Sequence, residues 1–183
     1  MKKLVLMSVF SFMFFIVSAQ VEKGSMVLSG RIGAYFENMA GKTSSFTIMP
    51  EFSYYFTEKL GAGLGVGYTY GKLPENFKIN RLEINPFIRY YFYKNNKLGI
   101  YGRGNLLLAV ENSRNSSNTV LGFGITPGIQ YFINKKISVE LNFMDILNYS
   151  YFTSPKAHSF SFIGNPMGVN LGTLSLTFNF HIK

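Results

Sequence analysis

The segment INPFIRYYF, which runs from Ile84 to Phe92, occurs in two further versions along the chain. These are IMPEFSYYF at Ile48–Phe56 and ITPGIQYFI at Ile125–Ile133. In every version the first, fifth and seventh residues are large and apolar, and charged or polar residues such as Glu51 and Arg89 stand between them. Side chains of a β-strand point alternately to opposite faces, so a period of two residues indicates strands. The segment therefore predicts three strands with one apolar face each.

The N-terminus has the pattern of a secretory signal peptide. Lys2 and Lys3 precede an almost unbroken apolar stretch, residues 4–17, and the small-residue sequence Val17-Ser18-Ala19 follows. An uncleaved anchor helix is the alternative, but the stretch is shorter than the roughly 20 residues that a spanning helix needs. We expect residues 1–19 to be removed and residues 20–183 to form a single exported domain. The chain has no cysteine, which excludes disulfides and thiol chemistry.

Eight segments of the exported part alternate like strands. Each is close to the ~9–11 residues that cross a membrane at a tilt. The predicted strands are residues 25–36, 45–56, 60–70, 81–93, 98–110, 119–132, 137–143 and 174–182. Short turns follow the second, fourth and sixth strands, whereas residues 37–44, 71–80, 111–118 and 149–172 form longer connections. This alternation is typical of the periplasmic turns and extracellular loops of an outer-membrane β-barrel.

A soluble eight-stranded barrel of the lipocalin type is the main competing fold. Its apolar face would point inward, and its outer face would carry both the charged residues and the glycines of the third strand, Gly61, Gly63, Gly65 and Gly67. The inverted arrangement fits better, because an eight-stranded lumen is just wide enough to be filled by side chains. We therefore predict an all-β transmembrane barrel, in which the glycines make room for arginines from other strands.

Six charged residues share the predicted inner face, and their charges cancel. We expect them to form a structural ion-pair plug, because an unpaired buried charge costs several kcal/mol. They are Arg31, Glu51, Glu83, Arg89, Arg103 and Glu140. A proton or ion path through the lumen is the functional alternative. The absence of steady conductance in a planar bilayer is the expected result for a plugged barrel.

The end of the repeated segment predicts an aromatic girdle at the periplasmic interface. Its members are Tyr54, Phe56, Tyr90, Phe92 and Tyr131. The same segments contain Pro50, Pro86 and Pro127, each of which removes a hydrogen-bond donor from a strand of a barrel that has no edge. The sequence leaves two accommodations open, bulges or bonds lost at the same height on three strands.

The connection at residues 149–172 is the predicted contact element for an external ligand. It is the longest loop and carries Tyr149, Tyr151, Phe152, Phe160 and Phe162, and exposed apolar clusters often mark interaction sites. The same segment could instead extend two strands above the membrane. The chain has a net charge of +9. Basic residues in the turns and loops suit anionic lipid headgroups and lipopolysaccharide, and the exported location argues against nucleic acid.

Enzymatic chemistry has weak support in the sequence. His158 with Ser159 or Ser161 superficially suggests a lipid A deacylase, but the His-x-Ser spacing of those enzymes would need a serine at position 160, which is Phe160. His158 and His181 are too far apart in sequence to indicate a metal site. We expect no enzyme activity, no cofactor and no metal.

The segments Asn85–Phe92 and Tyr55–Gly63, together with the signal peptide, resemble the small outer-membrane β-barrels related to the membrane domain of OmpA and to OmpX. The resemblance covers essentially all of residues 20–183. It implies an eight-stranded barrel in a bacterial outer membrane, with barrel-assembly machinery reading Phe178 or Phe180 in place of a terminal aromatic residue. Members are envelope structural proteins, adhesins and factors that resist host defences. The leading hypothesis is a monomeric, non-enzymatic barrel with a structural or adhesin-like role; a narrow channel comes second and a lipid-modifying enzyme third.

Overall fold

The computed structural model describes residues 21–37, 43–72, 78–113, 116–143, 145–153, 156–162 and 175–182. The predicted signal peptide and the basic residues Lys42 and Arg114 lie outside these ranges. Within them, no helix has the length and hydropathy needed to cross a membrane.

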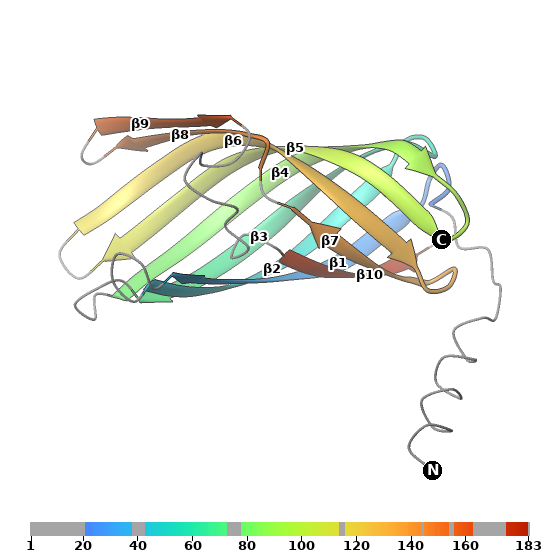
Figure 1. Cartoon of the computed structure of the whole chain (residues 1–183), viewed down its shortest axis with the longest axis horizontal. Helices are drawn as coiled ribbons and strands as arrows, with labels where there is room; N and C mark the ends of the chain where they lie inside the picture. The colour runs from blue at the N-terminus through green and yellow to red at the C-terminus, as the bar shows by residue number, and fades with distance from the viewer. Residues whose placement is uncertain are drawn as a thin grey trace, which may run out of the picture.

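Ten strands make up the regular structure of the described residues. They are β1 Met26–Glu37, β2 Thr43–Tyr55, β3 Leu60–Lys72, β4 Lys78–Lys94, β5 Leu98–Ser113, β6 Ser116–Phe132, β7 Ile137–Asn142, β8 Leu147–Thr153, β9 Lys156–Phe162 and β10 Ser175–Ile182. Eight of them close into one antiparallel barrel in the order β1-β2-β3-β4-β5-β6-β7-β10, with β10 pairing back to β1 (Figure 1). The prediction of an all-β, eight-stranded barrel is confirmed.

Strands β8 and β9 form a hairpin that joins the wall of the barrel beside β6. β6 pairs with β7 over Gly128–Phe132 and with β8 over Val120–Ile125, so β8 continues the line of β7 after a break. Of the two alternatives for residues 149–172, a long loop or extended strands, residues 149–153 and 156–162 form strands, and residues 154–155 and 163–172 lie outside the described residues. The residues of β8 and β9 alternate large and small side chains, and in this register the alternation places the large ones of β8 mostly on one face of the sheet.

Several strands run further than predicted, and the loops between them are correspondingly shorter. β4 begins at Lys78, β5 extends to Ser113 and β6 begins at Ser116. The connection expected at 111–118 therefore reduces to residues 114–115. Polar residues such as Asn112 and Ser117 pair across the β5–β6 ladder, so the strands continue beyond the apolar part of the wall.

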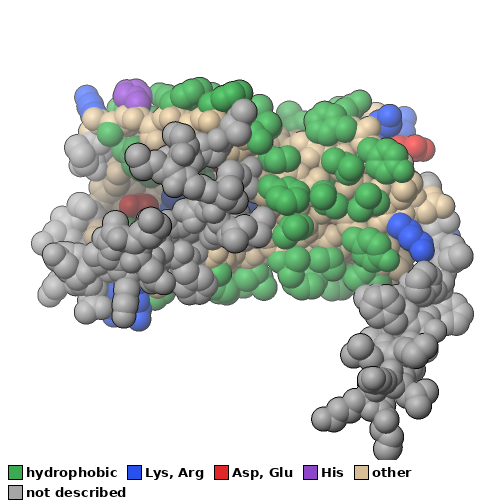
Figure 2. Space-filling model, viewed as in Figure 1, with side chains coloured by type: hydrophobic (Ala, Val, Ile, Leu, Met, Phe, Trp, Pro, Cys, Tyr) green, Lys and Arg blue, Asp and Glu red, His purple; other side chains and the backbone are tan. Residues whose placement is uncertain are grey.

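The two faces of the wall differ sharply in polarity. Outward-facing residues of the repeated segments, among them Ile48, Phe52, Ile84 and Ile88, are exposed, and hydrophobic side chains spread over the outside of the barrel (Figure 2). The fully buried side chains inside include Arg103 and Glu140. A soluble barrel would have the opposite arrangement, so the apolar outer wall matches a barrel surrounded by lipid.

Each of the three prolines lies on the outer face, and each interrupts one ladder only. Pro50 keeps its partner Gly30 on β1, whereas the β2–β3 register skips Met49 and Pro50. Likewise the β4–β5 register skips Asn85 and Pro86. Pro127 faces the break between β7 and β8, where its carbonyl oxygen accepts a hydrogen bond from the Phe143 N–H at 3.0 Å. Of the two accommodations left open by the sequence, lost ladder bonds are the observed one for Pro50 and Pro86.

The missing donor of Pro86 is replaced by a neighbouring side chain. The register places Pro86 opposite Leu106, whose carbonyl oxygen would accept the ladder bond. Asn85 instead donates from Nδ2 to that oxygen at 2.9 Å. The residue before the proline therefore restores one of the lost hydrogen bonds.

The glycines of β3 make room mainly for aromatic side chains and Met49. A Cβ at Gly61 would lie 2.7 Å from the Tyr55 ring, and one at Gly65 would lie 2.9 Å from the Met49 sulfur. At Gly63 a Cβ would overlap Phe87. The prediction that these glycines accommodate arginines is wrong, because none of the atoms nearest to an added Cβ at the four positions belongs to an arginine.

Candidate functional site: the filled lumen

Glu51 on β2 is the centre of the first of two ion-pair groups inside the barrel. Its Oε1 lies 2.7 Å from Arg31 Nη2 on β1, and its Oε2 lies 2.8 Å from Arg103 Nη1 on β5. Arg103 Nη2 donates to Asn85 Oδ1 on β4 at 2.8 Å. Glu51 and Arg103 are almost completely buried. One carboxylate therefore connects three strands, and the Asn85 amide is a further partner of the Arg103 guanidinium.

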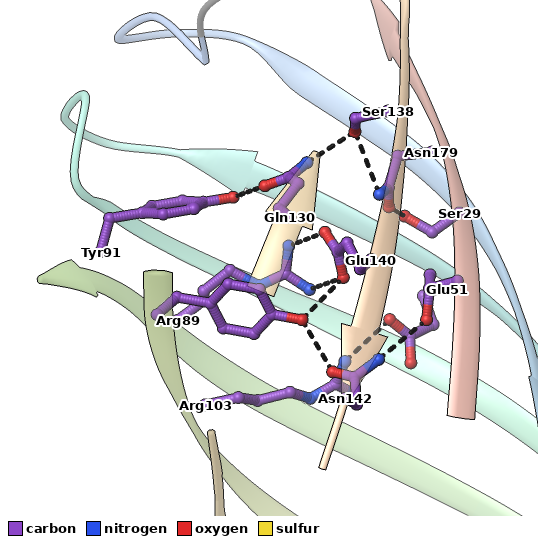
Figure 3. Close-up of polar contacts among 12 residues, drawn as sticks. Ser29, Glu51, Arg89, Tyr91, Arg103, Gln130, Ser138, Glu140, Asn142 and Asn179 are labelled. Atoms are coloured by element: carbon purple, nitrogen blue, oxygen red, sulfur yellow. Dashed lines mark hydrogen bonds and ion pairs between the residues drawn. The ribbon is translucent and has the colours of Figure 1, made fainter. Parts of the chain in front are cut away.

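Glu140 on β7 is the centre of the second group. Arg89 on β4 forms a bidentate ion pair with it: Nη1 donates to Oε1 and Nη2 donates to Oε2, the latter at 2.9 Å. The Tyr101 hydroxyl lies 3.0 Å from Glu140 Oε2 and 2.8 Å from Asn142 Oδ1. Such a two-pronged pair fixes the carboxylate's orientation as well as its charge. Figure 3 shows that the Glu51 and Glu140 groups lie next to each other in the lumen.

Neutral hydrogen bonds continue from these charges toward the end of the barrel that carries the short turns. Tyr91 bonds to Gln130, and Gln130 Nε2 donates to Ser138 Oγ at 2.6 Å (Figure 3). Ser138 Oγ also lies 2.8 Å from His181 Nε2 and 3.2 Å from Asn179 Nδ2. Side chains from seven of the eight barrel strands thus meet, while β3 contributes its glycine face.

An apolar and aromatic cluster fills the lumen beside this network. It consists of Val21, Val27, Tyr55, Tyr91, Tyr101 and Phe132, all buried. The arginines stack on such rings: Arg103 Cζ lies 3.6 Å from the centroid of Phe87, and Arg89 Cζ lies 4.4 Å from that of Tyr101. Stacking on an aromatic face stabilises a cation that has left water. We call the cluster of Val21, Val27, Tyr55, Tyr91, Tyr101 and Phe132 the aromatic seal.

The predicted plug residues do not form a single group. Arg31, Glu51, Arg89, Arg103 and Glu140 belong to the network. Glu83 lies apart, with Oε2 3.2 Å from Arg81 Nε, in a part-exposed pair. Arg81 was not predicted, although it stands two residues before Glu83 and so shares its face.

Sequence reasoning also missed the aromatic seal and Asp145. Tyr55, Tyr91 and Phe132 occupy the eighth position of the repeated segment, which the strand period places inside. The even position of these three residues in the repeat therefore indicates that they point inward, and it could have predicted their place in the lumen. Asp145 lies in the break between β7 and β8 and accepts a hydrogen bond from Thr126 Oγ1 at 2.5 Å. Because Asp145 lies outside the strands, the two-residue period does not indicate whether its side chain points into the barrel.

A polar cavity of about 440 Å³ lies beside the network toward the other end of the barrel. Arg31, Asn85 and Asn142 belong both to its lining and to the hydrogen-bonded network. Its further walls include Arg81, Glu83 and Asp145, with Asn148 and Ser161 of the β8–β9 hairpin. The lumen therefore contains a cavity whose base is the network.

The predicted girdle residues all lie on the outer face. Phe56, Tyr90, Phe92 and Tyr131 are exposed and Tyr54 is half-buried. The rings of Tyr54 and Phe56 meet edge to face at 5.2 Å, and those of Tyr90 and Phe92 at 5.5 Å. They stand near the short turns, and their periplasmic side stays a prediction.

The five aromatic residues of the predicted contact loop divide between the faces of the hairpin. The pairs Leu147↔Phe162, Tyr149↔Phe160 and Tyr151↔His158 share the outer face, and Phe152↔Ala157 shares the inner one.

His158 has a tyrosine partner in place of a serine. Its Nδ1 lies 2.7 Å from the Tyr149 hydroxyl. Ser159 and Ser161 pair with Ser150 and Asn148, which lie on the opposite face of the hairpin. The His–Ser arrangement considered from the sequence is therefore not formed. Among the described residues, no three His, Asp or Glu side chains lie close enough together to hold a metal ion.

Comparison with known proteins agrees with this architecture. Neisserial surface protein A has a similar structure, with a TM-score of 0.52 and 20% identity over 88% of this chain and 97% of that one. The outer membrane protein OprG from Pseudomonas aeruginosa gives a TM-score of 0.51 and 14% identity over 91% of this chain and 99% of that one. At these identities the likeness shows the fold alone, and no curated protein sequence matches the chain. The model of the outer membrane protein beta-barrel domain matches residues 4–180, and the chain belongs to that family.

Proposed function

We propose that this protein is a non-enzymatic, closed barrel of the bacterial outer membrane, with a structural role in the envelope and contacts made through its outer surfaces. The observation that carries the proposal is the cross-barrel network in which Arg103, Glu51, Arg89 and Glu140 are all nearly inaccessible to water. A conducting pore needs water beside its charged groups. Here the carboxylates and guanidinium groups neutralise one another, and stacking on aromatic rings further stabilises the arginines.

The packing of the aromatic seal supports the same conclusion. Tyr91 and Tyr101 pack edge to face at 5.6 Å, and Tyr55 and Tyr91 lie 6.1 Å apart. These rings fill the lumen next to the ion pairs, so an ion would have to displace both layers. A narrow channel would have to begin in the polar cavity and end at the network.

Planar-bilayer recording tests the closed state. The refolded protein is expected to give no steady conductance at moderate voltage, with a porin as the positive control for insertion and recording. Large, stable open events from the wild-type chain would refute the closed barrel and favour the channel.

A role in adhesion or host interaction would act through the end that carries the cavity and the hairpin. Photo-crosslinking in cells from positions 151 and 160 asks which molecules touch the outer face of that hairpin. Specific crosslinks to an external protein would support the surface-interaction role, and crosslinks to lipid alone would restrict the role to the envelope.

A further inference from the structure

The outer faces of β6, β8 and β9 form one continuous sheet surface three strands wide. The register aligns four rows across it. From the middle of the barrel outward these rows are Ile125-Leu147-Phe162, Phe123-Tyr149-Phe160, Leu121-Tyr151-His158 and Thr119-Thr153-Lys156.

Polarity rises steadily along these rows. The first is entirely aliphatic or phenyl, and the second adds one phenol. The third adds a phenol and an imidazole whose rings lie 4.9 Å apart, and the fourth has two hydroxyls and an ammonium group. Figure 2 shows the same order, with hydrophobic side chains along the wall and a histidine and a basic side chain at one end of the hairpin. We infer that the β8–β9 hairpin is an interfacial element whose outer face binds the phosphate-bearing lipids of the outer leaflet.

The length of β6 places this hairpin at the right depth. Tyr131 belongs to the aromatic girdle, and Leu121 on the same strand aligns with Tyr151 and His158. Leu121 and Tyr131 are ten residues apart, which corresponds to about 33 Å along a strand at ~3.3 Å per residue. At a tilt of about 40° this becomes ~25 Å, which is the usual height of the apolar band of such barrels. The Tyr151–His158 row therefore falls at the opposite interface.

A different pair of strands gives the same spacing. On β4, ten residues before the girdle residue Tyr90, stands Asn80. Its Oδ1 accepts a hydrogen bond from the Tyr68 hydroxyl on β3 at 2.7 Å. An outward tyrosine bonded to an amide marks the end of the apolar wall there too. Tyrosine is enriched at such interfaces because its ring prefers hydrocarbon and its hydroxyl prefers water.

The free edge of β9 limits how deeply the hairpin can lie. Among the described strands β9 pairs with β8 alone. Open sheet edges are not tolerated in hydrocarbon, because their N–H and C=O groups find no partner there. At the outer end of β9, from Lys156 to His158, headgroups and interfacial water can satisfy these groups, while Phe160 and Phe162, 65% and 62% exposed, lie deeper and turn toward the lipid tails. Lys156 then lies at the level of the lipid phosphates, which attract cations.

The inference rests on the proposed membrane barrel and identifies lipid as the partner of the hairpin's outer face. Single-tryptophan fluorescence tests it cleanly, because the chain contains no tryptophan. Phe160→Trp reports on the outer face, and Ala157→Trp, three residues away on the inner face of β9, is the matched control. Both are refolded as full chains into phosphatidylethanolamine and phosphatidylglycerol vesicles, with or without bromine on the acyl chains.

The expected result is a blue-shifted Phe160→Trp emission, strongly quenched by brominated lipid and little affected by acrylamide in the water. Ala157→Trp should show the reverse. Tyr151→Trp should respond more to bromines near the glycerol than to bromines deep in the chains. Equal acrylamide quenching of Phe160→Trp and Ala157→Trp would overturn the inference.

Two controls separate this test from that of the closed barrel. Each variant must keep the heat-dependent gel mobility of a folded barrel. Vesicle ion leakage, measured on the same samples, reports on the lumen alone. A leaky barrel with a lipid-quenched Phe160→Trp would refute the proposed closure and keep the interfacial hairpin, and a tight barrel with a water-quenched Phe160→Trp would do the opposite.

Discussion

Glu140 shows how strongly one side chain can depend on its partner. It is fully buried, and Arg89 and Tyr101 occupy its oxygens. Replacing two buried opposite charges together is far less costly than removing one of them, because the remaining ion then has no compensation.

Glu140→Leu is therefore expected to lower the free energy of unfolding by about 3–5 kcal/mol. The double variant Glu140→Leu/Arg89→Met should recover most of this loss. Urea unfolding in lipid vesicles measures both. Glu111→Gln is the matched control, since Glu111 is part-exposed and 4.0 Å from Arg81, and should cost less than about 1 kcal/mol. Equal losses for the single and double variants would contradict the assigned pairing.

Two glycines should differ in how far the same added methyl group lowers stability. Gly63→Ala would force a Cβ into Phe87 and the Phe52 carbonyl oxygen, whereas nothing lies within 4 Å of a Cβ at Gly104. Overpacking costs roughly 1–3 kcal/mol, so Gly63→Ala should lower the unfolding midpoint. Gly104→Ala should leave it almost unchanged. A comparable loss at both positions would show that strand propensity, and not the contact with Phe87, determines the cost.

The β4–β5 ladder illustrates how an element tolerates a proline. Asn85 donates to Leu106 and accepts from Arg103, so its amide serves the ladder and the ion-pair network together. Removing it leaves a buried carbonyl without its donor, at a cost of roughly 1–3 kcal/mol.

Asn85→Ala is expected to destabilise the barrel by that amount, and Pro86→Ala is expected to help more in the Asn85→Ala background than in the wild type. The reason is that alanine returns an N–H to the ladder, which the wild type has already replaced. A double-mutant cycle in urea gives the coupling energy. Additive effects would indicate that Asn85 acts through Arg103 alone.

The elements could be predicted from the sequence to different degrees. The repeated segment at Ile48–Phe56, Ile84–Phe92 and Ile125–Ile133 predicts three strands, and alternation elsewhere in the chain predicts the other five and the polarity of both faces. The sequence does not decide between a loop and strands for β8 and β9, because the two strands are only seven residues each and follow the break at Asp145. The alternation of large and small residues is short in each strand, and pairing stabilises it: β8 pairs with β6, and β9 pairs with β8.

At the scale of the whole molecule, the proposed closure depends on two sets of side chains, the ion pairs and the aromatic seal. Partner choice among the charges could not be predicted from sequence, since it depends on which side chains the closed barrel brings across the lumen. Glu51 and Glu83 both point to the inner face, as the arginines do. Glu51 nevertheless pairs with Arg31, whereas Glu83 pairs with Arg81.

Weakening both sets of side chains should open the lumen, whereas weakening one should not. Tyr55→Ser/Tyr91→Ser and Glu51→Ala/Arg103→Ala are each expected to stay closed in planar bilayers, and their combination is expected to conduct. Each pair of substitutions leaves the other set of side chains in the lumen, where it should still block ions. Single-channel recording decides, with heat-dependent gel mobility confirming that each variant is folded. Conduction by the first pair alone would assign closure to the rings.

The prolines divide the wall into units. The ladders β1–β2, β3–β4 and β5–β6 are unbroken, and the skipped pairs or breaks at Pro50, Pro86 and Pro127 fall between these hairpins. Cooperative units of a protein often coincide with such supersecondary motifs. Six of the eight barrel strands therefore form three intact hairpins with interrupted ladders between them, and β7 with β10 completes the wall. A chain entering the membrane can complete the bonds within each hairpin before the interrupted ladders between hairpins form.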